Sequence, residues 1–474
     1  MTDKELAKHV EENPLLTLVG DCADNLGLDA YVIGGYVRDL FLGRSLKDID
    51  IVAIGSGIEL AKAVKSKLGI NTSLSIYKNF GTAAIKHKSD DIEFVGARKE
   101  SYRANSRKPV VENGTLEDDQ NRRDFTINAL AIQLNKSARG KLLDPFDGVE
   151  DLRKRMIRTP LEPARTFSDD PLRIMRAIRF ASQLGFDIDP ETYEGILEMK
   201  ERLSIISQER ITGELNKVIL SSTPSYGFKF LFHSGVLSTI FPEMAKLHGV
   251  RKVKGKAHKD NFYHTLQVLD NVAKVSDNLW LRWAAILHDI AKPATQRFDE
   301  KAGWTFHGHE DLGARWVPKI FKRMKLPMNE SMRFVQKLVR LHLRPIALVN
   351  EKVTDSALRR LLYEAGDDIE DLMKLCKADI TSKNDQKVRK YLANFKKVEK
   401  KLGEVEEKDR VRNFKLPVTG EDIMGYFKLD PSREVGLIKE EIKEAILEGK
   451  IPNEREPALD LMKRAGEKLG LSRN

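Results

Sequence analysis

The 474-residue sequence predicts an α+β protein in which a small α/β domain is followed by a long helical remainder. Strand-like apolar runs lie between Tyr31 and Leu134, interrupted by one helical pattern at Ile58–Leu68. Beyond about Pro163 the apolar residues recur with the period of a helix. A chain of this length exceeds what one hydrophobic core organises, so about three or four domains are expected.

The order of the elements follows from these apolar runs. Residues 1–30 predict one or two amphipathic helices, and the segment 103–121 is expected to be a mobile loop because it is polar and lacks periodicity. Composition shifts near 230–260 and after the charged helix 390–410 indicate domain boundaries. The expected strands are YVIGG, DIDIVAI, TAAIKH, DIEFVGA and NALAIQL.

Composition restricts the class of protein. The formal net charge is +10, from 81 basic and 71 acidic residues, which suits a polyanionic partner. The two cysteines, Cys22 and Cys376, provide neither a disulfide framework nor a cysteine-based zinc site. The first residues lack a signal pattern, and no run reaches the roughly 18 apolar residues of a membrane span. A reducing, cytoplasmic location without a membrane partner is therefore expected.

Two aspartates in one apolar strand indicate a metal site. Asp48 and Asp50 lie two residues apart, so their side chains share one face of the strand, with Ile49 and Ile51 on the other. Such a carboxylate pair suits Mg²⁺, which prefers oxygen ligands and substrate phosphates. Glu93, in another expected strand, is a candidate third carboxylate. The alternative for each of these acids is a solvated strand end or edge.

A glycine pair before this strand indicates a phosphate cradle. Gly34 and Gly35 follow an apolar strand, and glycines there let backbone N–H groups approach a phosphate. Arg38 adds a cation one turn into the following helix. A phosphate cradle followed by a metal-binding pair is typical of an enzyme that uses nucleoside triphosphates.

These residues carry a family resemblance. GGYVRD at 34–39 and LKDID at 46–50 together resemble the active-site signature of the nucleotidyltransferase superfamily shared by CCA-adding enzymes and bacterial poly(A) polymerases. The resemblance covers roughly residues 31–220 and implies a polymerase-beta-like nucleotidyltransferase head followed by an all-α neck, HD body and tail. Three further motifs continue it in order: RRDFTINA (122–129), SDDPLRIMRAIRFASQLGF (168–186) and ERITGEL (209–215).

The resemblance sets the expected domains and partners. The body and tail are expected to bind the acceptor and T arms of tRNA by shape and phosphate contacts rather than by sequence. The expected domains are N-terminal helices 1–30, nucleotidyltransferase head 31–160, neck 161–235, HD domain 236–385 and tail 386–474.

A charged ridge is expected to select the nucleotide. One acidic and three basic residues recur every third position of a predicted helix: Asp170, Arg173, Arg176 and Arg179. A carboxylate only accepts hydrogen bonds and a guanidinium only donates them, so Asp170 with Arg173 matches the amino-bearing edges of cytosine and adenine and rejects uracil and guanine. The alternative is a basic face paired with acids of a neighbouring domain. The glutamate usual in the resembled family before the aspartate is Asp169 here.

The resemblance also implies roles residue by residue. Asp48, Asp50 and Glu93 would be catalytic, with the two aspartates holding Mg²⁺ in a two-metal mechanism. Relatives that add only CC lack the basic segment after DIEFVGA, which is complete here, so full CCA addition from CTP and ATP is favoured over A-addition alone or poly(A) synthesis. The alternative from another functional class is an RNA-binding protein without catalytic activity. The implied nucleotide-binding residues are Gly34, Gly35, Arg38, Asp39, Arg123, Asp124, Asn128, Asp170, Arg173, Arg176 and Arg179.

Histidines indicate a second site, because seven of the ten fall between 248 and 342. The order of these histidines resembles that of the HD metal-dependent phosphohydrolase family. The resemblance implies a phosphohydrolase whose substrate is a phosphate at an RNA end. Imidazole with carboxylate suits Mn, Fe, Ni or Zn better than Mg. A packing domain without chemistry is the alternative. The implied metal ligands are His264, His288, Asp289 and Asp379, with His309 and His342 placed for a second ion or a phosphate.

Overall fold

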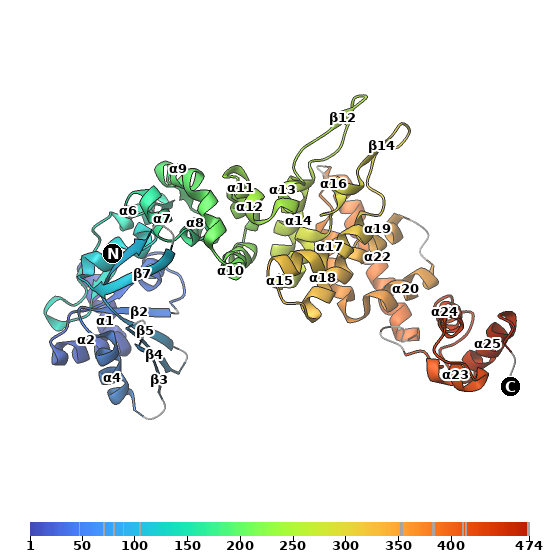
Figure 1. Ribbon diagram of the computed structural model, residues 1–474, viewed down its shortest axis with the longest axis horizontal. Coiled ribbons are helices and arrows are strands. Elements are labelled where there is room, and N and C mark those ends of the chain that lie inside the picture. Colours follow the sequence, from blue (N-terminus) through green and yellow to red (C-terminus); the bar gives the residue numbers. More distant parts are fainter. Residues whose placement is uncertain are drawn as a thin grey trace. The chain divides into compact units, whose positions relative to one another are not determined.

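A computed structural model divides the chain into two compact units, Met1–Pro242 and Glu243–Asn474 (Figure 1). It describes all residues except 47, 70–71, 79–80, 89, 104–105, 351–353, 382–383, 410–411, 413–414 and 472–474. The side chains of 99–103, 106–111, 350, 385 and 408–409 are also outside the description.

A mixed sheet is built from strands within residues 30–143 of the first unit (Figure 1). In the described residues its order is β3-β4-β5-β2-β1-β8-β9, and β2 and β5 run parallel while the other neighbours are antiparallel. The five expected strands are confirmed, whereas the exposed edge strand β3 and the two-residue β9 lack an apolar run long enough to predict them. The strands are β1 (Ala30–Ile33), β2 (Asp48–Ala53), β3 (Ser73–Tyr77), β4 (Thr82–His87), β5 (Asp90–Gly96), β8 (Ala131–Gln133) and β9 (Leu142–Leu143).

The helix α4 (Gly57–Leu68) packs on the apolar face of this sheet, with α2 (Pro14–Leu26) beside it. α4 buries Leu60, Ala61 and Val64 against the strands, beginning at Ser56, whose hydroxyl accepts from the Glu59 backbone N–H. The other helices of the unit are α1 (Asp3–Glu12), α2 (Pro14–Leu26), α3 (Gly35–Phe41), α5 (Leu116–Asn121), α6 (Gly148–Lys154), α7 (Pro163–Asp169), α8 (Leu172–Leu184), α9 (Pro190–Met199), α10 (Gln208–Ile219), α11 (Pro224–His233) and α12 (Val236–Ile240). Short 3-10 helices lie at η2 (Thr126–Asn128), η3 (Lys136–Ala138) and η4 (Lys200–Ile205).

The expected loop 103–121 is largely regular structure, so that prediction was wrong. β6 (Arg98–Arg103) and β7 (Ser106–Asn113) form an antiparallel hairpin, with residues 104–105 outside the described residues. α5 then begins with a capping box, in which the Thr115 hydroxyl and the Asp118 carboxylate satisfy each other's backbone N–H groups.

Asp170 does not lie on the helix of the expected ridge, which corrects that part of the prediction. α7 ends at Asp169, Asp170 has extended backbone angles, and Pro171 caps the start of α8. Proline disfavours the helical conformation of the residue before it, so a continuous helix through Asp170 is excluded. The three arginines do lie on α8.

In its described residues, the second unit is helical apart from two short hairpins that lie side by side (Figure 1). The hairpins are β12 (Lys252–Val253) with β13 (Lys256–Ala257), and β14 (Arg297–Asp299) with β15 (Gly303–Thr305). The helices are α13 (Pro242–Ala245), where the two units meet in sequence, α14 (Asn261–Ala273), α15 (Leu279–Leu287), α16 (Lys292–Thr295), α17 (His309–Arg323), α18 (Glu330–Leu341), α19 (Leu343–Asn350), α20 (Asp355–Ala365), η5 (Gly366–Asp368), α21 (Ile369–Ala378), α22 (Asp385–Asp409), α23 (Gly420–Phe427), α24 (Arg433–Leu447) and α25 (Arg455–Lys468). The last three helices share a separate apolar core that includes Ile423, Ile438 and Met462. Among the described residues, no helix has the length and apolar character needed to cross a membrane.

Candidate nucleotide and metal sites

The expected aspartate pair lies on a strand with one buried and one accessible face. Ile49 and Ile51 are buried, whereas Asp48 is exposed and Asp50 half-buried, as the alternation predicts. Asp50 is the register partner of Glu93 across the parallel β2–β5 pair, so Glu93 points to the same face. Burial raises the pKa of Asp50, and the charges of Glu93 and Asp48 add to that rise while Arg123 opposes it.

A cavity of about 430 Å³ opens beside this pair. Glu93, Asp170 and Arg173 are absent from the described residues that line it, although all three were predicted as site residues. The carboxylate oxygens of Asp48, Asp50 and Glu93 do not all lie within 4.8 Å of one another. The lining residues are Gly34, Gly35, Tyr36, Arg38, Asp39, Ser45, Asp48, Asp50, Arg123, Asp124, Asn128, Arg176, Arg179, Phe180, Gln183 and Lys217.

Gly34 is required at the wall of the cavity for two reasons. Its φ of 82° lies in the region that favours glycine. A Cβ at this position would lie 2.9 Å from Arg123 Nη1 and 3.3 Å from Asp50 Oδ2. The glycine therefore lets the first strand turn into α3 while the aspartate and the arginine approach the backbone.

A chain of hydrogen bonds joins three of the sequence motifs. Arg38 donates to both carboxylate oxygens of Asp39 at 2.9 Å and to Asn128 Oδ1 at 2.9 Å. Asn128 Nδ2 donates to Asp124 Oδ1 at 3.0 Å, and Arg176 Nε donates to Asp124 Oδ2 at 2.7 Å. Although burial opposes it, the Arg176 charge lowers the pKa of Asp124 to about 2. The network therefore holds ionised partners at fixed positions around the cavity.

Asp119 organises the arginine pair of the RRD motif and was not singled out from the sequence. Its carboxylate is fully buried and pairs with Arg122 on one oxygen and with Arg123 on the other, at 3.1 Å for Arg123 Nη2. Arg123 Nη1 also donates to the Asn128 carbonyl at 3.3 Å. Arg122 and Arg123 follow Asp119 by three and four residues, the spacing at which side chains of a helix are neighbours. This spacing could have predicted both ion pairs from the sequence.

Three arginines, one from α3 and two from α8, surround one aromatic ring. The guanidinium carbons of Arg38, Arg176 and Arg179 lie 5.1, 5.5 and 4.0 Å from the centroid of the Phe180 ring. Arg179 also pairs with Glu214 at 2.9 Å, and Arg176 pairs with Asp124, so both arginines have acidic partners. Asp124 belongs to the expected head, as the alternative required, whereas Glu214 belongs to the same expected neck as Arg179. The ring face attracts these cations and places them at the cavity.

Asp170 and Arg173 lie beside the cavity rather than in its wall. Arg173 is buried and donates to two backbone carbonyls, of Thr166 at 3.2 Å and of Arg122 at 2.5 Å. Asp170 accepts from the Leu172 N–H at 3.1 Å and lies 3.5 Å from Arg210 Nη2. The bond to Arg122 connects Arg173 with the residue that precedes cavity-lining Arg123.

The predicted HD residues are brought together in the second unit. They lie at helix ends or within α14, and their ligand atoms form two groups: His264, His288 and Asp379, and Asp289, His309 and His342. Within each group these atoms lie within 4.8 Å of one another. Burial raises the pKa of both aspartates, but other groups outweigh it. The neighbouring imidazoles and Lys292 hold the pKa of Asp289 well below its usual range, and hydrogen bonds from His264 and His288 do the same for the pKa of Asp379.

Two residues of the HD site were not predicted. Lys292 Nζ donates to Asp289 Oδ2 at 2.6 Å, and the string HDIAK places it one helical turn after the aspartate. Thr381 Oγ1 lies 2.8 Å from His264 Nδ1 and accepts from Lys259 Nζ at 3.0 Å. The Lys292 spacing is readable in the sequence, whereas the Thr381 contact joins residues 117 positions apart.

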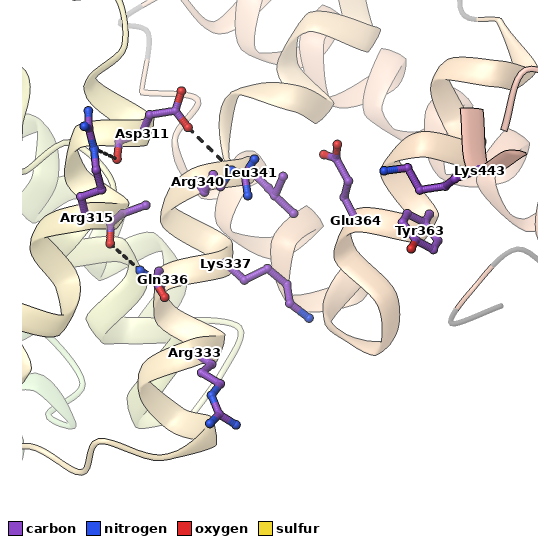
Figure 2. Close-up of a pocket in the computed structure, with 11 residues that line it drawn as sticks. Asp311, Arg315, Arg333, Gln336, Lys337, Arg340, Leu341, Tyr363, Glu364 and Lys443 are labelled. Carbon is purple, nitrogen blue, oxygen red and sulfur yellow. Dashed lines mark hydrogen bonds and ion pairs between the residues drawn. The ribbon is translucent and has the colours of Figure 1, made fainter. Parts of the chain in front are cut away.

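A second, open cavity of about 1090 Å³ lies in the same unit between α17, α18, α20 and α24 (Figure 2). None of the predicted site residues lines it. Its charges are largely paired, since Arg340 lies 3.6 Å from Asp311, Lys337 Nζ 2.6 Å from Asp368 and Lys443 Nζ 2.5 Å from Glu440. This pairing gives the cavity a mixed rather than a uniformly basic wall.

Comparison with known families divides the chain into three matched regions. Residues 30–158 match the poly(A) polymerase head domain, and residues 185–247 match a family described as a probable RNA- and SrmB-binding site of polymerase A. Residues 261–383 match the HD domain.

Curated relatives include multifunctional CCA proteins. The one from Pseudomonas fluorescens is 34% identical over 306 residues, which cover 63% of this chain and 70% of the relative. The one from Nitrosococcus oceani is 33% identical over 319 residues, covering 65% and 73%.

Solved structures share the fold. A CCA-adding enzyme from Bacillus stearothermophilus, determined in complex with CTP, superposes with a TM-score of 0.64 at 23% identity, covering 97% of this chain and 99% of that one. The CCA-adding enzyme of Thermotoga maritima, determined with a tRNA ending in CCA, gives a TM-score of 0.60 at 22% identity, with 99% of both chains covered.

Proposed function

The chain belongs to the family of multifunctional CCA proteins, and on that premise we propose that it adds CCA to tRNA 3′ ends from CTP and ATP without a nucleic-acid template. It is a nucleotidyltransferase. The observation that carries the proposal is the 430 Å³ cavity, where Asp48 and Asp50 meet Gly34 and the arginines of two other motifs.

The donor set of the head fits Mg²⁺. Asp48 and Asp50 share an accessible face, and burial, with the charges of Glu93 and Asp48, raises the pKa of Asp50, a rise that a divalent cation would offset. Asp48 and Asp50 would hold Mg²⁺, which would lower the pKa of the tRNA 3′-hydroxyl and neutralise charge at the leaving pyrophosphate. Glu93 supplies further negative charge on the same face.

The remaining residues of the cavity position the nucleotide. Arg38, Arg176 and Arg179 offer guanidinium donors to the triphosphate, and their partners hold these groups in place before substrate arrives. Gly34 and Gly35 let the backbone approach the phosphates. No covalent intermediate is needed, because positioning and charge neutralisation account for the transfer.

Asp170 and Arg173 are proposed to read the base. The donor and acceptor pattern of the pair favours cytosine and adenine. The proposal is supported by the bond from Arg173 to the carbonyl of Arg122, the residue before cavity-lining Arg123. Because Arg173 is now bonded to two carbonyls, reading a base would exchange at least one of those bonds for the nucleotide.

The deciding experiment supplies tRNA lacking CCA, Mg²⁺ and labelled CTP, ATP or UTP. Both CTP and ATP should be incorporated, UTP should not, and Asp48→Ala should abolish incorporation. CTP and ATP are each tested on three substrates: tRNA without any CCA residue, tRNA ending in C and tRNA ending in CC. The results separate full CCA addition from A-addition alone. Incorporation of UTP as readily as CTP would refute the proposal, as would no incorporation at all.

The five-part domain division, cytoplasmic location and tRNA contacts by the tail 386–474 are part of the same proposal. The order of the three family matches supports the domain division, and the net charge of +10 supports the tRNA contacts. The intact aspartate pair argues against a non-catalytic RNA-binding protein, which would not require it.

A second activity is supported by the HD site. His264, His288, Asp289 and Asp379 would hold a transition metal such as Mn, Fe, Ni or Zn, because imidazole and carboxylate suit these ions. The proposed substrates are 2′,3′-cyclic or terminal phosphates of RNA ends. Hydrolysis of such a phosphate should require a transition metal, should be lost in Asp289→Ala and should persist in Asp48→Ala.

A further inference from the structure

A small cavity lies at the base of β12–β13, the first hairpin of the second unit. Its volume is about 210 Å³, below the roughly 300–1,000 Å³ of sites for drug-sized ligands, so it admits a small ligand such as one nucleoside. Neither neighbouring family match covers the segment 248–260, because one ends at residue 247 and the other begins at residue 261. The polar side chains of the cavity wall include Lys246, His248, Arg251, His258, Asn261 and Gln296.

The cavity adjoins the HD site along two elements. Asn261, in the cavity wall, precedes the proposed metal ligand His264 by three residues on α14, so the two side chains are neighbours on that helix. Pro293, also in the wall, directly follows Lys292, whose Nζ donates to Asp289 Oδ2 at 2.6 Å. A ligand in the cavity therefore lies next to the residues proposed to bind metal.

His258 places a fixed aromatic ring in the cavity wall. Its Nδ1 donates to the Lys259 carbonyl at 2.6 Å, and its Nε2 accepts from the Arg251 backbone N–H at 3.1 Å. Its ring centroid lies 5.3 Å from that of Trp304 and 5.8 Å from that of Phe306. Because both nitrogens and two neighbouring rings hold it, the imidazole keeps one orientation. Rings fixed in this way are the groups on which unpaired bases stack.

Gln296 supplies an unused hydrogen-bond donor to the same cavity. Its Nε2 is buried and has no hydrogen-bond partner among the described residues. An unpaired buried donor is costly, and an acceptor on a bound ligand would satisfy it. A side-chain amide offers both a donor and an acceptor, the combination that pairs with the edge of a base.

The charge around the cavity favours an anionic ligand. None of the described residues that line the cavity is acidic, whereas Lys246 and Arg251 are basic. Lys254 pairs with Glu300 of the second hairpin at 2.5 Å. A basic segment that continues from an aromatic wall is typical of sites for single-stranded nucleic acid. Five of the nine residues 251–259 are basic and none is acidic, the five being Arg251, Lys252, Lys254, Lys256 and Lys259.

We propose that this cavity binds the terminal nucleoside of a single-stranded RNA end whose phosphate is hydrolysed at the HD site, an inference that rests on the phosphohydrolase function proposed above. His258 stacks on the base, the Gln296 amide bonds to its edge, and Arg251 contacts the phosphate on the 5′ side of the nucleoside. In the hydrolysis, water adds to phosphorus, one P–O ester bond breaks, and the departing ribose oxygen takes a proton from that water.

Substrates matched with and without a nucleoside test the proposal. The full chain, loaded in turn with Mn²⁺, Ni²⁺ and Zn²⁺, is assayed on cytidine 2′,3′-cyclic phosphate and on ethylene phosphate, which has the same cyclic diester and no nucleoside. Cytidine 3′-phosphate and glycerol 2-phosphate form the second pair. In each pair kcat/KM should be at least tenfold higher for the nucleotide, the least that a stacked and hydrogen-bonded base is expected to contribute.

Two variants separate the base contact from the strand contact. Gln296→Leu should raise KM about tenfold for both nucleotides and leave kcat/KM unchanged for ethylene phosphate and glycerol 2-phosphate. Arg251→Gln should raise KM about tenfold for a dinucleotide ending in a 2′,3′-cyclic phosphate, but not for the mononucleotide, which lacks the 5′-side phosphate. Lys301→Gln is the matched control, because it makes the same change of charge at an exposed position outside the cavity. It should leave every KM unchanged.

The outcomes distinguish the nucleoside site from the activity that it serves. Equal kcat/KM with and without a nucleoside, or an unchanged KM in Gln296→Leu, would overturn the nucleoside site and leave the phosphohydrolase function intact. Hydrolysis of none of these substrates with any of the three metals would overturn both. Thermal unfolding of each variant establishes that it is folded.

Discussion

Arg176 and Asp124 form a two-bond ion pair, with Arg176 Nε and Nη2 at 2.7 and 2.5 Å from Asp124 Oδ2. Asp124 belongs to the RRD motif and Arg176 to α8, so the pair fastens the helix carrying the proposed nucleotide-selecting arginine to the segment beside the aspartate strand. Through Asn128 it continues to Arg38. Nucleotide binding and base selection are therefore expected to respond together to changes at this pair.

Replacing Arg176 should expose that coupling. Arg176→Gln leaves the buried Asp124 carboxylate without its cation, at a cost of roughly 1–3 kcal/mol in unfolding free energy. Incorporation of both CTP and ATP should fall, because Asp124 is no longer held by Arg176 and so no longer fixes Asn128 and, through it, Arg38. Arg176→Lys keeps the charge but not the two-bond geometry and should be intermediate. The double variant Arg176→Gln with Asp124→Asn should recover stability; a purely additive loss would contradict the coupling.

The same pair predicts how stability depends on pH. The folded-state pKa of Asp124 is about 2, below the unfolded value of about 3.9, so the stabilisation is fully present above about pH 4 and disappears as pH falls through 2. The difference in unfolding free energy between the wild type and Asp124→Asn should be about 2 kcal/mol at pH 6. Denaturant titrations at pH 6, 4 and 3 should show it shrinking; a difference that grows on acidification would be inconsistent with the ion pair.

Phe180 is expected to position arginines rather than to contact the reacting atoms. Phe180→Leu removes the ring beside Arg38, Arg176 and Arg179, and each lost cation–π contact is worth about 0.5–1 kcal/mol. KM for CTP and ATP should rise about tenfold with a smaller change in kcat. Phe180→Tyr keeps the ring and serves as the control. A large fall in kcat at unchanged KM would assign the ring a different role.

Gly34→Ala tests the close approach of the backbone to the cavity. The new Cβ would lie 2.9 Å from Arg123 Nη1, so nucleotide incorporation should fall by a factor of ten or more, roughly the effect of 1.4 kcal/mol or more on the barrier. Gly27→Ala is the matched control, since Gly27 has a φ of 64° with nothing within 4 Å. Both variants should lose about 1 kcal/mol of stability from backbone strain, but only Gly34→Ala should lose activity.

Thr381 is predicted to tune the HD site through His264. Thr381→Val removes the hydroxyl 2.8 Å from His264 Nδ1 and should weaken metal binding about 10–100-fold, as loss of a ligand's hydrogen-bond partner usually does. Thr381→Ser retains the hydroxyl and should bind normally. Competition with a chelator measures both. Equal affinity in the two variants would show that the hydroxyl does not orient the imidazole.

Local patterns in the sequence were enough to predict several features of the fold and site. The two-residue period of β2 placed Asp48 and Asp50 on the accessible face, as the burial of Ile49 and Ile51 confirms. The Asp170 error was avoidable, because Pro171 directly follows it and is typical of a helix start. The error at 103–121 was partly avoidable, because TLED is a capping-box pattern.

Other features could not be predicted because they join distant segments. Glu214 pairs with Arg179 across 35 positions, and Asp124 with Arg176 across 52. Nothing in a local run of residues specifies such partners, since any acid on a neighbouring helix would satisfy the same arginine. His309 and His342 likewise approach Asp289, at 3.2 and 3.9 Å, only because helix ends far apart in the sequence meet around it.

The register of β2 with β5 sets how insertions and deletions should be tolerated in the head. Asp50 faces Glu93 because the two strands align residue for residue, from Asp48 with Asp91 to Ala53 with Gly96. A one-residue deletion inside either strand would turn one of the carboxylates toward α4. A length change in the β3–β4 connection would leave the alignment intact. Length variation among functional homologues should therefore be confined to such connections.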